Sequence, residues 1–123
     1  MAEQFESHFA REVADVLKRS GFLVTVEPSI GGLRPDFVAK TPEGRTIVVE
    51  VKRWVPNRAH IQRAKKQVEL YKQATDADAA FIVMSGLESG SPSEGIFTLD
   101  ELAKELTVPG KVDAGKRRQS VQV

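Results

Sequence analysis

Three charged residues interrupt two apolar, strand-like segments. Asp36 follows Pro35 at the start of one segment, and Glu50 and Lys52 lie in the β-branched run that ends the next. A charged group that leaves water without a partner is destabilising. Because strand side chains alternate between the two faces of a sheet, Glu50 and Lys52 are expected to point the same way. These three residues are therefore candidates for a functional site.

Metal-assisted hydrolysis of a phosphate ester is the chemistry that this set suits best. Pairing of the two segments through the "TPEG" turn is expected to set Asp36 opposite Val51, close to both charges. Two carboxylates suit Mg²⁺, which keeps several waters and accepts phosphate oxygens. A bound metal lowers the pKa of its water and offsets charge at phosphorus. Lys52 could orient the water, stabilise the transition state or act as a base.

The elements that must position these residues follow from the hydrophobic pattern. Apolar residues at helical spacing predict helices over 3–20, 58–75 and 98–106, and Thr98 with Glu101 forms a capping box. β-Branched runs predict strands in "FLVTVEP", "PDFVAK", "TIVVEVKRW" and "AAFIVMS", with a short strand in "IFT". A helix that joins two strands of one sheet favours a parallel crossover, so we expect an α/β fold with a mixed sheet.

Composition favours one domain in the cytoplasm. The 123 residues are 41% hydrophobic and 28% charged, which predicts a domain over 1–108 and a loose basic tail over 109–123. Absence of cysteine excludes disulfides and thiolate metal sites. The chain has no stretch apolar enough for a membrane span, and no Walker motif that would indicate a nucleotide cofactor.

The charge is unevenly distributed. The net charge is +1, yet residues 52–72 contain seven Lys or Arg and one acid, whereas residues 76–105 are acidic. A polyanion such as DNA is one expected partner of the basic segment, and a solvated helix surface is the alternative. Trp54 and Phe37 are assigned to the core or its rim, in preference to the alternative that they are platforms on which bases stack. The candidate nucleic-acid contacts are Arg53, Arg58, Arg63, Lys65 and Lys66.

These residues resemble the signature of the PD-(D/E)xK nucleases. Pro35-Asp36 is followed, fourteen positions after the aspartate, by Glu50-Val51-Lys52. Gln67 and Tyr71 resemble the Q-x-x-x-Y motif of RecB-like members. The segment that precedes Pro35 is similar to Holliday-junction resolvases and Mrr-like nucleases, in which a glutamate of the first helix joins the site; either Glu12 or Glu6 would fill that place.

The resemblance implies a restriction-endonuclease-like αβββαβ core and a metal-dependent endonuclease that hydrolyses DNA phosphodiester bonds, with selectivity for DNA structure. It implies Mg²⁺, or Mn²⁺ as a substitute, and a homodimer. A catalytically inactive DNA-binding or assembly module with the same fold is the alternative. The implied catalytic residues are Asp36, Glu50, Lys52, Gln67 and Tyr71, and the implied metal ligands are Asp36, Glu50, the backbone carbonyl of Val51 and Glu12.

Overall fold

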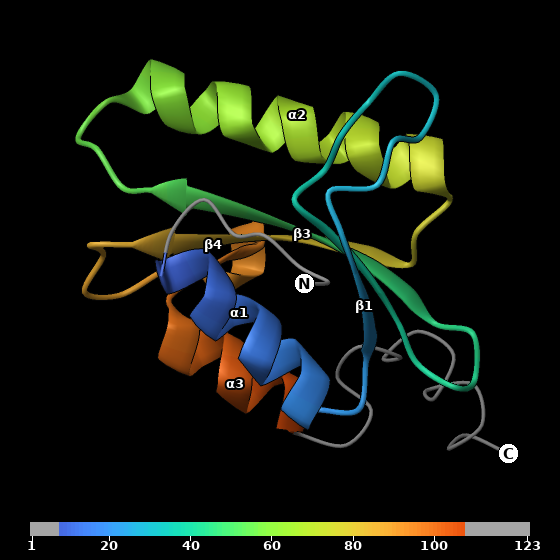
Figure 1. Cartoon of the computed structure of the whole chain (residues 1–123). Helices are drawn as coiled ribbons and strands as arrows, with labels where there is room; N and C mark the ends of the chain where they lie inside the picture. The colour runs from blue at the N-terminus through green and yellow to red at the C-terminus, as the bar shows by residue number, and fades with distance from the viewer. Residues whose placement is uncertain (1–7, 108–123) are drawn as a thin grey trace, which may run out of the picture.

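The structure, a computed structural model, describes residues 8–107, which form a five-stranded mixed sheet between two layers of helices (Figure 1). The expected order of helix, three strands, helix and strand is confirmed, and a short strand and a helix follow. The elements are α1 (His8–Arg19), β1 (Leu23–Val26), β2 (Phe37–Lys40), β3 (Thr46–Arg53), α2 (Arg58–Thr75), β4 (Ala79–Ser85), a 3₁₀ turn (Pro92–Glu94), β5 (Ile96–Phe97) and α3 (Leu99–Thr107).

The strands follow one another across the sheet in chain order. β1, β2 and β3 form an antiparallel meander, whereas β3 with β4 and β4 with β5 run parallel. The predicted crossover is confirmed, because α2 connects the parallel neighbours β3 and β4. This connection lays α2 along the sheet directly after the strand that carries Glu50 and Lys52 (Figure 1).

Alternation along β3 divides the core into two layers. Ile47 and Val49 pack in a cluster with residues of α1 and α3, whereas Val48 packs with Ala64 and Val68 of α2. Glu50 and Lys52 continue the Val48 side of the strand. The charged pair therefore lies on the face that α2 covers.

The expected register of the two strands is one position out, although Asp36 does lie close to Val51, as expected. The strands pair Phe37 with Val49 and Val38 with Val48, so the next step brings Asp36 opposite Glu50. The reason lies in the turn, where Gly44, at φ 92°, donates to the Thr41 carbonyl, which leaves three residues between the last paired positions, 41 and 45. Asp36 and Glu50 consequently share a face.

Side chains cap the first turns of α3 and α2, and the cap of α3 was predicted from the sequence. Thr98 Oγ1 accepts from the Glu101 N–H while Glu101 Oε1 accepts from the Thr98 N–H, so the predicted capping box is present. Asn57 caps α2 by accepting from the His60 N–H. Residues 3–7 of the predicted first helix and the predicted tail over 109–123 lie outside the described residues. No helix within 8–107 is long and apolar enough to span a membrane.

Candidate active site

Asp36 is fixed in place by its backbone as well as its side chain. Its carbonyl accepts from the Glu27 N–H at 2.7 Å, which continues the pairing of β1 with β2. Its own N–H donates to Glu50 Oε1 at 2.9 Å, and its Oδ2 accepts from the Val51 N–H at 2.8 Å. The carboxylate of Asp36 is thus held at the point where β2 begins and β3 loses its β2 partner.

Pro35 contributes to this arrangement by lacking an N–H. If the ladder between β2 and β3 is continued, Pro35 comes opposite Val51, where it cannot donate a hydrogen bond to the Val51 carbonyl. The Asp36 side chain accepts the Val51 N–H instead. Because the N–H and C=O of one strand residue point to the same side, the Val51 carbonyl lies on the same edge of β3 as the N–H that Asp36 accepts.

Glu50 is a buried carboxylate, with 4% of the residue exposed. Its pKa is raised from 4.5 to about 7, chiefly by burial and next by the negative charge of Asp36, while the Asp36 N–H and Lys52 act in the opposite direction. Glu50 Oε2 lies 3.7 Å from Lys52 Nζ. The site therefore places two carboxylates and one ammonium together. The environment of Glu50 favours its protonated form.

Tyr71 and Gln67 of α2 complete the group. Tyr71 is 7% exposed. Burial raises its pKa, and the charges of Glu50 and Asp36 raise it further, while a hydrogen bond from Gln67 lowers it. The phenol thus lies within the electrostatic reach of both carboxylates and of the Gln67 amide. The helical spacing of i and i+4 that suggested this pair brings the two side chains into contact.

An open cleft of about 490 Å³, which we call the active-site cleft, lies beside this group. Lys52, Gln67 and Tyr71 form part of its wall, and the loop between β1 and β2 contributes Leu33. Its basic residues are Arg63, Lys66 and His60. The sequence gave no reason to expect Leu33 here. The loop reaches α2 only through tertiary packing, where Leu33 packs against the cluster that contains Val68 and Tyr71.

The five predicted nucleic-acid contacts do not share one surface. Arg63 and Lys66 line the active-site cleft, whereas Lys65 points to the other side of α2, where its Nζ lies 2.7 Å from Glu94 Oε1. Arg58 lines a separate hollow on that other side. Arg53 is exposed at the end of β3.

Glu12 does not lie near the carboxylates of Asp36 and Glu50. It lies on α1, in the helix layer on the other face of the sheet, and its Oε2 is 4.0 Å from His8 Nε2. Within residues 8–107, no three acidic or histidine side chains are grouped closely enough to hold a metal ion. Glu6, the competing candidate, lies outside the described residues. The described donors are therefore Asp36, Glu50 and the Val51 carbonyl.

Comparison with known proteins gives a family and a shared fold. The family model described as "Domain of unknown function (DUF8371)" matches residues 3–88. No curated protein matches the chain. Among solved structures, the SPO1766 protein of unknown function from Silicibacter pomeroyi is 22% identical, with 99% of this chain and 94% of that chain covered and a TM-score of 0.51. This similarity extends over nearly the whole of both chains and indicates a common fold.

Two partial similarities are weaker. An fdxN element excision controlling factor protein from Anabaena variabilis is 25% identical, covering 62% of this chain and 67% of that one, with a TM-score of 0.46. A repair endonuclease from Pyrococcus abyssi is 22% identical, covering 68% of this chain and 40% of that one, with a TM-score of 0.43.

Proposed function

We propose that this chain, which belongs to the DUF8371 family, is a metal-dependent endonuclease that hydrolyses DNA phosphodiester bonds. One observation carries the proposal: Asp36, Glu50 and Lys52 meet beside a cleft that contains basic residues. Burial of ionisable groups is costly unless a partner or a function compensates it. The resemblance of the same residues to the PD-(D/E)xK signature supports this reading.

The donor set fits Mg²⁺. This ion takes one or two carboxylates and completes its shell with water and phosphate oxygens, so Asp36, Glu50 and the Val51 carbonyl suffice to hold it. The raised pKa of Glu50 supports the fit, because the Asp36 charge that disfavours ionisation would be offset by a cation. When bound, the ion would lower the pKa of a coordinated water and neutralise charge on the phosphate. Mn²⁺ accepts the same oxygen ligands.

Lys52 supplies the positive charge that the protein itself brings to the reaction. Its Nζ lies near Glu50 Oε2, so it can donate hydrogen bonds to an oxygen held beside that carboxylate. A fixed, partly buried ammonium stabilises the negative charge that develops in the transition state. It can also move a proton to or from the reacting oxygens. Gln67 and Tyr71, which line the same cleft as Lys52, would position Lys52 or the substrate from α2.

The rim of the active-site cleft suits the DNA backbone. Arg63 and Lys66 are exposed on the side of α2 that faces the cleft, with His60 beside them. Contacts of Lys and Arg to phosphate supply sequence-independent affinity and correct register. Two such sites are the simplest way to hydrolyse both strands of a duplex, so a homodimer is part of the proposal and can be checked by the mass of the protein in solution.

The test is cleavage of several DNA forms with Mg²⁺, with Mn²⁺ and with a chelator. Linear duplex, circular, single-stranded and four-way-junction DNA should be compared, using Glu50→Gln as the variant and Glu43→Gln as a matched control, since Glu43 is an exposed glutamate of the turn before β3. Cleavage by the wild type and the control, lost with chelator and in Glu50→Gln, is expected. If the wild type binds DNA but cuts no form of it faster than Glu50→Gln does, the catalytic proposal is wrong. The alternative, an inactive DNA-binding module, then replaces it.

A further inference from the structure

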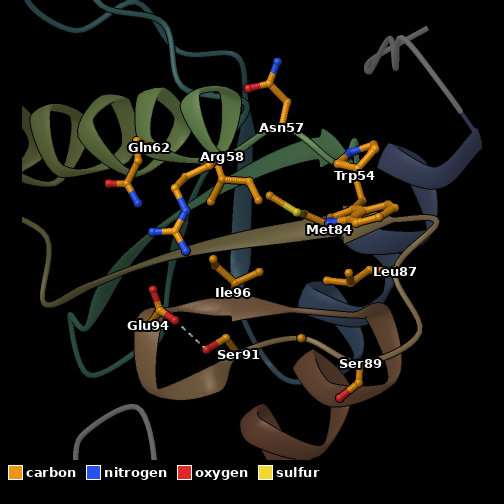
Figure 2. A pocket seen from close by; sticks show the side chains of 13 residues that line it. Trp54, Asn57, Arg58, Gln62, Met84, Leu87, Ser89, Ser91, Glu94 and Ile96 are labelled. Carbon is orange, nitrogen blue, oxygen red and sulfur yellow. Dashed lines mark hydrogen bonds between the residues drawn. The ribbon is translucent and has the colours of Figure 1, made fainter.

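A second hollow, of about 410 Å³, opens on the other side of α2 (Figure 2). We call it the Trp54 pocket. Met84 of β4 and Ile96 of β5 form an apolar part of its lining, the first turns of α2 contribute Arg58 and Ile61, and the loop after β4 contributes Ser91. None of these residues belongs to the active-site cleft.

Trp54 presents an aromatic surface in this pocket. The side chain is 37% exposed, and it lies beside Met84 in Figure 2. The Trp54 N–H donates to the Ser85 carbonyl at 2.9 Å, so its backbone continues the pairing of β3 with β4. This position of Trp54 at the rim of the core agrees with the expectation from the sequence. Its indole is nevertheless partly exposed in the pocket and is available for contact with a ligand.

The Trp54 pocket and the active-site cleft lie on the same face of the sheet. Lys52 lines the cleft and Trp54 lines the pocket, and two residues along an extended chain span roughly 7 Å. α2 separates the two hollows, with Arg58 and Ile61 on the pocket side and Arg63 on the cleft side. A ligand with repeating units could therefore occupy both.

The charges in the Trp54 pocket favour an anionic ligand. Glu94 faces it, but Lys65 Nζ lies 2.7 Å from Glu94 Oε1 and the Ser91 hydroxyl donates to Glu94 Oε2 at 2.9 Å. Both contacts lower the pKa of Glu94, and the charge of Arg58 lowers it further, so the negative charge of Glu94 is already balanced by neighbouring groups. Arg58 is then the cation of the lining, and Figure 2 shows its guanidinium directed into the hollow.

We propose that the Trp54 pocket binds one unstacked nucleotide of the DNA strand that enters the active-site cleft, with its base against the indole and its phosphate at Arg58. The inference rests on the proposed function, since it is the DNA substrate that would reach both hollows. Gln62 and Ser91 offer hydrogen bonds to a base edge. Stacking on an aromatic side chain tolerates any base, because every base has a flat aromatic face.

The inference defines a substrate class. A base inside an intact duplex is paired and stacked, so it cannot lie against the indole unless it leaves the helix, at a cost of a few kcal/mol. DNA that already has unpaired nucleotides beside the cleavage point avoids this cost. The preferred substrates are therefore single strands and duplexes with a single-stranded branch or end, in preference to blunt duplexes.

Trp54 is the single tryptophan of the chain, so its fluorescence reports on the pocket directly. The wild-type protein, with a chelator to prevent cleavage, should be titrated with oligothymidine, with an abasic strand of the same length, and with a blunt duplex. We expect saturable quenching by oligothymidine, and much weaker quenching by the abasic strand, which supplies phosphates without bases. Equal quenching by the abasic strand or by the blunt duplex would overturn the inference.

Variants test the same contact without using the indole signal. In anisotropy measurements with labelled oligothymidine, Trp54→Ala should weaken binding about 10-fold, and Trp54→Tyr should restore most of the affinity. Arg58→Gln should weaken binding and reduce its dependence on salt. Leu23→Ala, which removes an apolar side chain that is 76% exposed on β1, is the control and should bind as the wild type does. Equal affinity of Trp54→Ala and Leu23→Ala would contradict the inference.

Failure of the pocket and failure of the catalytic proposal give different results. If the protein cuts DNA with Mg²⁺ but Trp54 does not respond to single strands, the endonuclease stands and the pocket inference is wrong. If single strands quench Trp54 but no DNA form is cut, the pocket is supported as a nucleic-acid site and the catalytic proposal is wrong. Both measurements use the same 123-residue chain.

Discussion

The two faces of the sheet bury different kinds of side chain. The face covered by α1 and α3 is apolar, with Leu17, Val49 and Leu102 each at 0% exposure. The face covered by α2 is apolar near Val48 and Ile82 but carries Glu50 where β3 extends beyond β2. The difference indicates that the face covered by α1 and α3 mainly stabilises the fold, whereas the face covered by α2 is less stable because it holds charged groups together.

The largest expected effect separates the roles of the charged residues on the α2 face. Glu50→Ala should abolish Mg²⁺ binding, because it removes a metal ligand. Cleavage should fall by at least ~10³-fold, because the bound metal stabilises the transition state by several kcal/mol. Lys52→Ala should retain binding of metal and DNA and cleave ~10²-fold more slowly, because a fixed charge acts mainly in the transition state. Calorimetric titration with Mg²⁺ and single-turnover rates measure the two quantities.

Lys40→Ala is a suitable control for these variants, since Lys40 is an exposed lysine at the end of β2. It should match the wild type in both assays. Equal Mg²⁺ affinity of Glu50→Ala and the wild type would remove Glu50 from the metal site.

On the apolar face, the expected effect is on stability alone. Leu17→Ala removes a fully buried side chain from the layer between α1 and the sheet, and should lower the free energy of unfolding by about 3 kcal/mol. Lys52→Ala should leave the unfolding free energy nearly unchanged, because its ammonium is only partly buried. Urea denaturation measures both. A Leu17→Ala variant that kept its stability and lost Mg²⁺ binding would contradict the division between the faces.

The third effect concerns the pH dependence of stability in metal-free protein. Because the pKa of Glu50 is raised from 4.5 to about 7, the native state holds this proton more tightly than the unfolded state does. Stability should therefore be greatest below pH 4.5 and fall as the pH rises to about 7. Glu50→Gln removes this dependence and should be more stable than the wild type at pH 8, by at most ~3 kcal/mol.

Denaturation midpoints at pH 5 and pH 8 test this prediction, and Mg²⁺ should stabilise the wild type but not Glu50→Gln at pH 8. The control Glu43→Gln, in the exposed turn, should change the midpoints little. If wild type and Glu50→Gln respond to pH in the same way, the buried carboxylate is not the source of the dependence.

Local patterns in the sequence were sufficient for the elements and for the shared face of Glu50 and Lys52. Alternation places the two residues on one side of β3, and helical spacing places Gln67 beside Tyr71. The register between β2 and β3 was predicted one residue out, because it depends on the conformation of Gly44 in a turn whose length alone does not fix the pairing. Sequence order thus identified the partners of Asp36 but not their alignment.

Tertiary packing accounts for what the sequence did not indicate. A basic run on α2 was treated as one surface, yet adjacent positions on a helix differ by about 100°, so Lys65 and Lys66 point in different directions. Only the packing of α2 on the sheet shows which side meets the active-site cleft and which meets Glu94. The pocket around Trp54 likewise combines strands, a helix and a loop that are far apart in the sequence.

The smallest expected effect concerns these two sides of α2. Arg63→Gln and Lys66→Gln should each weaken binding of blunt duplex DNA severalfold, equally for all sequences, and lower the slope of log affinity against log salt by about 1. Lys65→Gln removes the same charge from the same helix, but its ammonium is engaged with Glu94 away from the active-site cleft. It should leave the slope unchanged for blunt duplex DNA. Filter binding at a series of salt concentrations measures the three slopes, and equal reductions for Lys65 and Lys66 would mean that duplex DNA contacts α2 without regard to its two sides.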